Sequence, residues 1–419
     1  MRIGLPLKRE HSRISAAPLT FQLDHPASRS PKGAPADTSR LLWIDVLRGF
    51  AACYVLLFHV AELPRYRPQV SAWLSPFVGA GWSGVTLFFV LSAYTLCVTA
   101  DRRRSDPKWI RCFYVRRVFR IVPLYYVWVA VMAWLTWGTK VPEHARSLLL
   151  YAGFGFNLLP EHQNGLVWAS WTLGVEMLFY AVFPMIFRVV TAPSRAVGFL
   201  IVSFIASTIH YAVVTTWFPE SSGRLTYIYF SIFHQLPVFA FGICAFFFGR
   251  SLAVTNRIAV NRVVLLLCAV VGALAVPYVT PNLPLLLKTY VMAACYAGIV
   301  LAISALPLST RGTRPLVYLG IISYSLYLNH PLIVYHAASV YRWVYSGGLD
   351  SHVALFLCYT LTLIVLVVVS HITFHVIERP GMYLGSWLIK RISTPPEIVR
   401  TAGSERRFPT TPKRPSTRD

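Results

Sequence analysis

The chain has 419 residues, of which 56% are hydrophobic and only 13% are charged, and its formal net charge is +23 at pH 7. Soluble domains carry about 25% charged residues, so this composition excludes an ordinary soluble enzyme and favours a protein embedded in a membrane. The positive charge does not indicate a nucleic-acid partner, because the basic residues lie in short loops and tails beside apolar segments, where membrane lipid is the expected polyanion.

The two ends of the chain differ from the middle. Residues 1–40 are polar, with no apolar stretch of the signal-peptide type, and we expect a disordered basic tail in the cytosol. Residues 41–382 contain all the long apolar runs and form the predicted membrane domain. Residues 383–419 are the second predicted basic tail in the cytosol.

The apolar runs predict an all-α polytopic bundle of about ten transmembrane helices, because about 20 residues are needed to cross the hydrocarbon core. The predicted crossings are residues 41–60, 79–99, 121–138, 171–188, 196–217, 228–249, 263–280, 284–306, 316–339 and 353–377. The stretch 146–160 is apolar but short and rich in glycine, so we expect a re-entrant or interfacial segment there.

Basic residues in the predicted loops indicate the orientation. The loop 101–120 carries eight of them, and the loops expected on the same side add Arg188, Arg195, Arg250, Arg257, Arg262, Arg311 and Arg314. The opposite loops contain Arg65, Arg67, Lys140, Arg146, Arg224 and Arg342. The positive-inside rule therefore places both termini in the cytosol. A crossing at 146–160 would invert every later loop.

The first predicted crossing carries ionisable residues on one face. Arg48 and His59 are eleven residues apart, about 1100° of helical rotation, so they share a face about 16 Å apart along the axis. Asp45 lies three residues before Arg48, and mutual neutralisation of this pair would explain both without any function. A single histidine at a helix end is commonly interfacial. Placing a charged side chain inside the membrane costs at least about 2.5–3.5 kcal/mol, so ionisable residues that share one helix face favour a functional site.

Two later crossings carry polar faces as well. The residues that share a face are Thr172, Glu176 and Tyr180 in the fourth crossing, and Ser323, Tyr327 and His330 in the ninth. Pro331 lacks a backbone donor and frees the carbonyl of Tyr327, a common way to open a polar pocket in a crossing. Hydrogen bonds between helices explain most hydroxyl groups of this kind, but explain Glu176 and His330 less well.

The last crossing contains a possible metal pattern. His371, His375 and Glu378 have the spacing of a site with two histidines and one carboxylate. Histidines are also common at helix ends near the interface, and other candidate ligands are far away in sequence. We expect no bound metal.

Several blocks resemble acyltransferase family 3 and occur in that family's order. RLLWIDVLRGFAACYVLLFH (40–59) is similar to its opening helix, whose signature is an arginine, ten residues and a histidine, matched here by Arg48 and His59. The other similar blocks are GWSGVTLFFVLSAY (81–94), RRVFRIVPLYY (116–126) with Arg117, Arg120 and Pro123, WTLGVEMLFYAVFP (171–184) with Glu176 and Tyr180, LPVFAFG (236–242), ISYSLYLNHP (322–331) and IERP (377–380). Ala93, Thr172 and Met177 replace the residues usual in the family.

This resemblance implies a membrane O-acyltransferase of the bacterial inner membrane that modifies a polysaccharide or a lipid-linked glycan. No bound cofactor is implied: acyl-CoA, with acetyl-CoA expected, is the cytosolic donor substrate. The acceptor is a carbohydrate hydroxyl, although a secreted signal glycan or a macrolide is also compatible with the family. The partners expected are therefore acyl-CoA, a glycan and membrane lipid, with no nucleic acid.

Roles for the residues follow from the same resemblance. The catalytic residues are expected to be His59, Arg48 and Glu176, the donor-binding residues Arg117 and Arg120, and the acceptor-binding residues Tyr327 and His330. Guanidinium groups can hold the donor's phosphates or polarise its carbonyl, and an imidazole can act as general base or as transient acyl carrier. Glu176 would orient His59 or a sugar hydroxyl.

Two other classes of protein also explain buried charge. A transporter or flippase of a glycan or lipid predicts an inverted repeat with paired broken helices, yet the helix with Arg48 and His59 has no counterpart after residue 210. A scaffold without chemistry predicts that the polar face is dispensable.

Overall fold

The computed structural model describes residues 39–62, 70–135, 141–218, 223–254, 259–304 and 312–393. Within these ranges the chain is helical, with no strand, and nine helices are long and apolar enough to cross a membrane, or ten if one bent pair counts as a crossing. This confirms the predicted all-α bundle. The predicted tail 1–40 lies outside the described residues except for its last two positions, and Arg65, Arg67, Lys140, Arg257 and Arg311 also lie outside them.

The helices have the following bounds. The long ones are α1 (Ser39–Glu62), α3 (Ser83–Arg102), α4 (Trp109–Leu135), α6 (Trp171–Val189), α7 (Pro193–Trp217), α9 (Ile232–Val254), α10 (Ala259–Val279), α11 (Leu285–Ile303) and α15 (Ser351–Thr373). The shorter ones are α2 (Ser75–Gly79), α5 (Val141–Ala152), α8 (Arg224–Phe230), α12 (Arg314–Ile321), α13 (Ser323–His336), α14 (Ala338–Ser346) and α16 (Arg379–Ser393). Two short 3-10 turns span Ala80–Trp82 and Phe156–Leu158.

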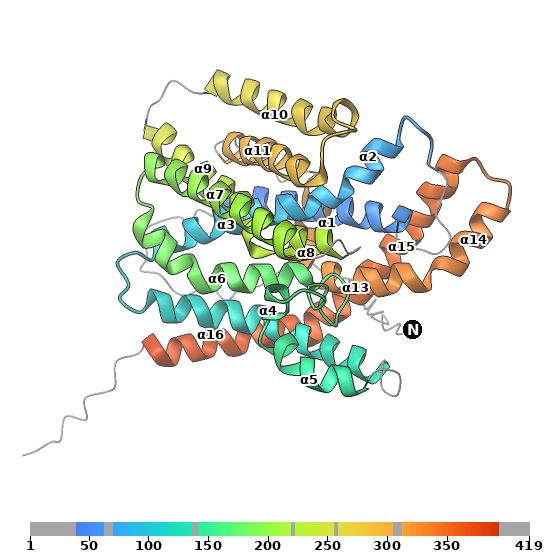
Figure 1. Ribbon diagram of the computed structural model, residues 1–419, viewed down its shortest axis with the longest axis horizontal. Coiled ribbons are helices and arrows are strands. Elements are labelled where there is room, and N and C mark those ends of the chain that lie inside the picture. Colours follow the sequence, from blue (N-terminus) through green and yellow to red (C-terminus); the bar gives the residue numbers. More distant parts are fainter. Residues whose placement is uncertain are drawn as a thin grey trace, which may run out of the picture. The chain divides into compact units, whose positions relative to one another are not determined.

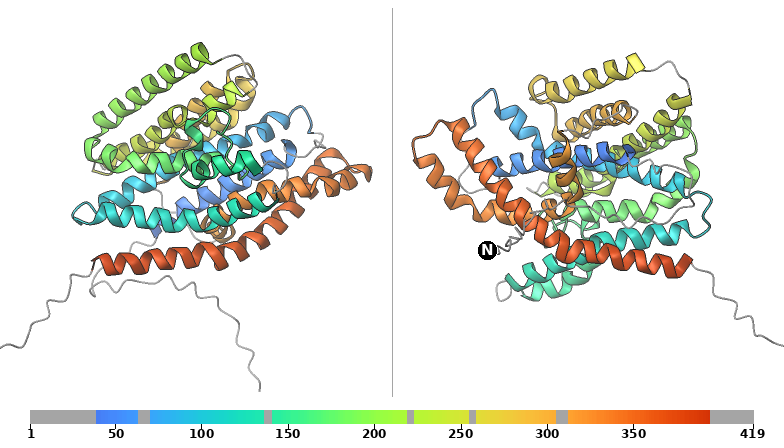
Figure 2. Two further views of the ribbon diagram at one scale, coloured as in Figure 1. Left: turned by 60° about the horizontal axis from the view of Figure 1, so that its bottom comes forward. Right: turned by 180° about the vertical axis from the view of Figure 1, so that it is seen from behind.

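Helix α1 packs among many partners. It contacts α3, α12, α13 and α15, while α7, α9, α10 and α11 pack on one another beyond α3 and α16 packs along α4 (Figures 1 and 2). In the most apolar stretches of α7 and α10, only 17% and 11% of the residues are buried inside the protein. The corresponding share is 72% for Ser75–Arg102, which contains α3. Apolar faces that no protein covers fit contact with lipid, whereas the helices around α1 form the protein core.

The third crossing begins earlier than predicted. Helix α4 starts at Trp109 instead of residue 121, so the second half of the predicted basic loop 101–120 is helical. Its arginines are accommodated by neighbouring rings: the guanidinium of Arg117 lies 5.8 Å from the ring centroid of Phe113 and 5.3 Å from that of Tyr180. Contacts between a cation and aromatic rings let a charge enter the bundle, which a hydropathy window cannot detect.

The ninth crossing, predicted as one helix over 316–339, is a pair bent by 78° between α12 and α13. Glycines let α12 cross α1 with the two backbones in contact: a Cβ atom on Gly320 would lie 1.9 Å from the carbonyl oxygen of Asp45, and one on Gly49 would lie 2.2 Å from that of Leu316. Close crossings of this kind need small residues. The bend follows directly after this contact and places Ser323 at the start of α13.

Of two further segments, one agrees with its prediction and one is longer than predicted. The stretch 146–160 forms the end of α5 and the turn Phe156–Leu158, and it is not among the helices long enough to cross, as predicted. The last crossing, predicted for 353–377, continues through a π-helical turn (Phe374–Glu378) into α16. The predicted domain end at residue 382 therefore lies inside a helix.

The contact between α1 and α12 gives a first test. Replacing Gly320 with alanine is expected to lower the free energy of unfolding by about 1–3 kcal/mol, because the added methyl group meets a backbone oxygen that cannot move without opening the crossing. Thermal unfolding of the purified protein in detergent measures the loss. Gly198→Ala on α7 is the matched control, since a Cβ atom there meets nothing within 4 Å. Equal stability of the two variants would contradict the assigned packing.

Candidate active site

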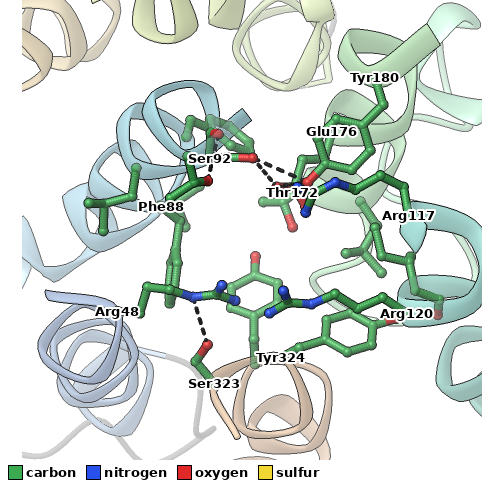
Figure 3. A pocket seen from close by; sticks show the side chains of 17 residues that line it. Arg48, Phe88, Ser92, Arg117, Arg120, Thr172, Glu176, Tyr180, Ser323 and Tyr324 are labelled. Atoms are coloured by element: carbon green, nitrogen blue, oxygen red, sulfur yellow. Dashed lines mark hydrogen bonds between the residues drawn. The ribbon is translucent and has the colours of Figure 1, made fainter. Parts of the chain in front are cut away.

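Residues from five helices surround a small cavity of about 80 Å³, which we call the basic cavity (Figure 3). Its polar lining residues are Arg48, Ser92, Thr95, Arg117, Arg120, Thr172, Glu176, Tyr180, Ser323, Tyr324 and Tyr327. The predicted shared face of Thr172, Glu176 and Tyr180 is confirmed, since all three line this cavity. Three guanidinium groups face one carboxylate, so the cavity suits an anion or a carbonyl oxygen that gains negative charge.

Arg48 is positioned by the bend between α12 and α13. Its Nε donates a hydrogen bond to the hydroxyl of Ser323, over 3.2 Å. Figure 3 shows Arg48 and Arg120 extending toward each other beside the ring of Tyr324. The hydroxyl of Tyr324 donates to the carbonyl oxygen of Ile121 over 2.6 Å, which ties α13 to α4. The two arginines therefore come from helices that are fixed relative to each other.

Glu176 accepts two hydrogen bonds on one carboxylate oxygen. The donors are the hydroxyl of Ser92 on α3, at 2.6 Å, and the hydroxyl of Tyr180 on its own helix, at 2.5 Å. The expected contact of Glu176 with His59 is not found, because His59 lines a different cavity. The helix face that carries Glu176 instead lines the basic cavity together with the three arginines. Ser92 was not predicted as a site residue.

A second and much larger cavity, of about 1220 Å³, lies next to the first, and we call it the aromatic cavity. Its aromatic lining residues are Phe58, Trp82, Tyr151, Trp168, Trp171, Tyr211, Tyr229, Phe230, Tyr327 and Tyr335. His59 lines it as well, and the described lining contains no Asp, Glu, Lys or Arg. Val85 and Tyr327 line both cavities, so these two side chains form their common boundary.

The imidazole of His59 has one defined tautomer. Its Nδ1 lies 2.8 Å from the carbonyl oxygen of Val55, and because a carbonyl can only accept, Nδ1 carries the hydrogen. In the neutral ring, Nε2 then has a free lone pair. This is the protonation state that a general base or a nucleophile needs.

His330 packs against His59, with 4.6 Å between the ring centroids in an edge-to-face arrangement. Its Nδ1 donates to the carbonyl oxygen of Tyr327 over 2.6 Å, the carbonyl that Pro331 was predicted to free. Only 2% of His330 is exposed, and its Nε2 has no hydrogen-bond partner among the described residues. His330 is absent from the described lining of the aromatic cavity, and its ring packs on that of His59. Its contact with the acceptor stays a prediction.

A loop between α5 and α6 contacts Tyr327, which lines both cavities, and sequence reasoning did not select the residues of this loop. The carbonyl oxygen of Ala169 accepts from the hydroxyls of Tyr327 and Thr172, each at 3.2 Å. Ala169 has a φ of 63°, which is strained for a residue with a side chain. Buried Asn157 donates to the carbonyl oxygens of Trp171 and Phe230 and fixes the loop. Asn157 lies outside the long helices, so the helical spacing of polar residues could not single it out.

The metal pattern of the last crossing does not converge. The π-helical turn directs Glu378 inward, where it is buried and accepts from the hydroxyl of Ser325 over 2.8 Å. His371 instead bonds the hydroxyl of Tyr318. Within the described residues no group of three or more His, Cys, Asp or Glu side chains is arranged to hold a metal ion.

Comparisons with known proteins agree with this geometry. The family model of an acyltransferase domain matches residues 41–372. The chain is 32% identical over 133 residues to the exopolysaccharide production protein ExoZ of Rhizobium meliloti, covering 30% of this chain and 38% of that protein. It is 29% identical over 205 residues to the acyltransferase MdmB of Streptomyces mycarofaciens, covering 45% and 50%.

A third similarity is longer. The chain is 27% identical over 367 residues to the putative membrane-bound transacylase BcsY of Komagataeibacter xylinus, covering 81% of this chain and 82% of that protein. The chain thus spans half or less of the first two relatives and most of the third. No solved structure matches the chain.

Proposed function

The chain belongs to the acyltransferase family whose domain model matches residues 41–372, and from this premise we propose that it is an integral membrane O-acyltransferase acting on a carbohydrate. In the proposed reaction an acyl group, acetyl in the simplest case, moves from acyl-CoA to a sugar hydroxyl. One observation carries the proposal: α1 presents Arg48 to a basic cavity and His59 to an adjoining aromatic cavity.

The basic cavity is the proposed donor site. Pockets that enclose a whole small molecule have volumes of about 300–1,000 Å³, so a cavity of about 80 Å³ has room only for the acyl end of the donor. The nucleotide part would stay near the basic start of α4, where Arg111 and Arg116 lie. The positive-inside pattern supports a cytosolic position for this end of the bundle.

The transfer itself needs one base and one group that stabilises negative charge. The acceptor oxygen attacks the thioester carbon near the boundary formed by Val85 and Tyr327, and Nε2 of His59 takes the hydroxyl proton. Arg48 stabilises the negative charge on the carbonyl oxygen. The C–S bond then breaks, the ester forms, and the thiolate takes the proton to become the free thiol. A variant of this path places the acyl group on Nε2 of His59 first.

A transporter remains the second candidate function and makes a different structural demand. Inverted-repeat transporters place a broken helix in each half. Among the described residues only one pair of helices, α12 with α13, is sharply bent and could count as a broken crossing. This asymmetry favours the enzyme.

Reconstituted liposomes test the proposal. With radiolabelled acetyl-CoA supplied on the side of the basic cavity and envelope glycans on the other, labelled glycan is expected to form along with one free CoA thiol per ester. Protein-free liposomes and donor supplied on the opposite side are the controls. Glycan crossing the bilayer without label would favour the transporter, and failure to consume acetyl-CoA with any glycan would overturn the enzyme.

A further inference from the structure

Charge is divided unequally between the two cavities, and this division indicates the class of acceptor. The basic cavity contains three arginines and one glutamate, whereas the described lining of the aromatic cavity contains no charged side chain other than the ionisable His59. We propose that the aromatic cavity binds an uncharged oligosaccharide of at least two sugar units and selects against uronic acids and other anionic glycans. This inference rests on the proposed function.

The first argument is the cost of burying a charge. A carboxylate that leaves water needs a cation or several hydrogen-bond donors in the place that it enters. The side-chain donors in the described lining are Tyr hydroxyls, Trp N–H groups, Asn164 and Thr226, with no guanidinium or ammonium group. A neutral sugar hydroxyl is satisfied by such groups, while a sugar carboxylate is not.

The second argument is the shape of the aromatic surface. The rings of Trp171 and Phe230 are stacked, with centroids 4.1 Å apart and planes at 7°, and Trp168 meets Tyr335 edge to face at 5.0 Å. Flat aromatic faces pack well against the C–H faces of sugar rings, a contact that requires no charge on the sugar. Rings at several places around the cavity therefore fit a chain of sugar rings.

These rings are held in place before a ligand arrives. The amide nitrogen of Asn157, which is 1% exposed, donates to the carbonyl oxygen of Trp171 at 3.0 Å and to that of Phe230 at 3.1 Å. One buried side chain thus fixes the backbone of both members of the stacked pair. A preorganised wall of this kind lowers the entropy lost when a flexible oligosaccharide binds.

The third argument is size. The aromatic cavity measures about 1220 Å³, which is above the range of about 300–1,000 Å³ found for pockets that hold one small molecule. A single sugar would leave most of the aromatic wall uncovered. The cavity therefore fits an acceptor of two or more units.

A matched pair of ligands tests the charge selection directly. Oligogalacturonate of four units and its carboxyl-reduced form have the same length and linkage and differ only at C6, where each carboxylate becomes a neutral hydroxymethyl group. Quenching of tryptophan fluorescence in the full chain, reconstituted in nanodiscs of neutral lipid, is expected to give a dissociation constant at least about ten-fold lower for the reduced form. The monosaccharide galactose is expected to bind at least about ten-fold more weakly than the reduced tetramer.

Variants assign the binding to this cavity. Trp168→Leu is expected to weaken binding of the reduced tetramer about ten-fold, while Trp217→Leu, on the exposed face of α7, leaves it unchanged. Equal or tighter binding of the anionic form, or no saturable binding of either form, would overturn the inference. Because binding is measured without donor, such a failure is distinct from a failure of acetyl-CoA consumption, which concerns the proposed function.

Discussion

Replacing His59 with glutamine is expected to lower the rate of acyl transfer by about 10²–10⁴-fold, the usual contribution of a general base. Glutamine keeps a hydrogen-bonding side chain of similar size but cannot take the proton that Nε2 accepts. The imidazole is held by its hydrogen bond to the carbonyl oxygen of Val55. Because glutamine has a similar size, the substitution removes the proton-accepting nitrogen and changes the packing little. Initial rates with saturating acetyl-CoA and glycan measure the effect.

A second histidine serves as the control for this experiment. His336→Gln changes an exposed imidazole at the end of α13 that lines neither the basic nor the aromatic cavity, and its rate is expected to equal that of the unaltered protein. Circular dichroism and size-exclusion profiles show whether each variant folds. A folded His59→Gln protein with an unchanged rate would exclude this residue from the reaction.

The same variant separates the two roles left open for His59. Incubation with labelled donor and no acceptor is expected to label the unaltered chain if the imidazole carries the acyl group, and to leave it unlabelled if the imidazole is only a base. The His59→Gln chain stays unlabelled in either case. Label retained by that variant would place the carrier at another residue.

Replacing Arg48 with alanine is expected to lower kcat/KM for the donor by about 10²–10³-fold, the effect of removing one group that stabilises an oxyanion. Arg48→Lys keeps the positive charge but lacks the planar guanidinium and the hydrogen bond from Nε to the hydroxyl of Ser323. Most of the decrease in kcat/KM is therefore expected in this variant as well. Ser323→Ala removes the hydroxyl that accepts one hydrogen bond from the guanidinium and is expected to cost about ten-fold or less. The steady-state rate at a series of donor concentrations measures all three.

The order of these effects is the critical result. A purely structural role would make the alanine and lysine variants unstable to similar degrees and would leave KM for the donor unchanged in the protein that folds. Arg195→Ala, which alters an exposed arginine near the start of α7, is the matched control and is expected to be silent. If Arg48→Ala retained full kcat/KM, the basic cavity would not be the donor site.

Spacing along single helices predicted much of the site. Thr172, Glu176 and Tyr180 share a face because four residues make about one helical turn, and that face lines the basic cavity. The freed carbonyl of Tyr327 followed from the missing N–H of Pro331, and the structure shows His330 bonded to it. Such features depend only on residues within one helix.

The remaining features depend on contacts between distant segments, which spacing cannot show. The 78° bend before Ser323 follows a backbone contact that two glycines on different helices allow, and no proline or polar run marks it. The pairing of His59 with His330 depends on how α1 packs on α13. Asn157 resembled an ordinary loop residue, although it is buried against the helix that carries Glu176.

The boundary formed by Val85 and Tyr327 has a consequence for the energy supply of the cell. A continuous water-filled path through this protein would let protons and hydrated ions run down the gradient that drives ATP synthesis. The valine side chain and the tyrosine ring that line both cavities resist wetting, which opposes the passage of hydrated ions between them. In the proposed reaction, the same two side chains insulate the bilayer electrically where the uncharged acyl group passes to the acceptor.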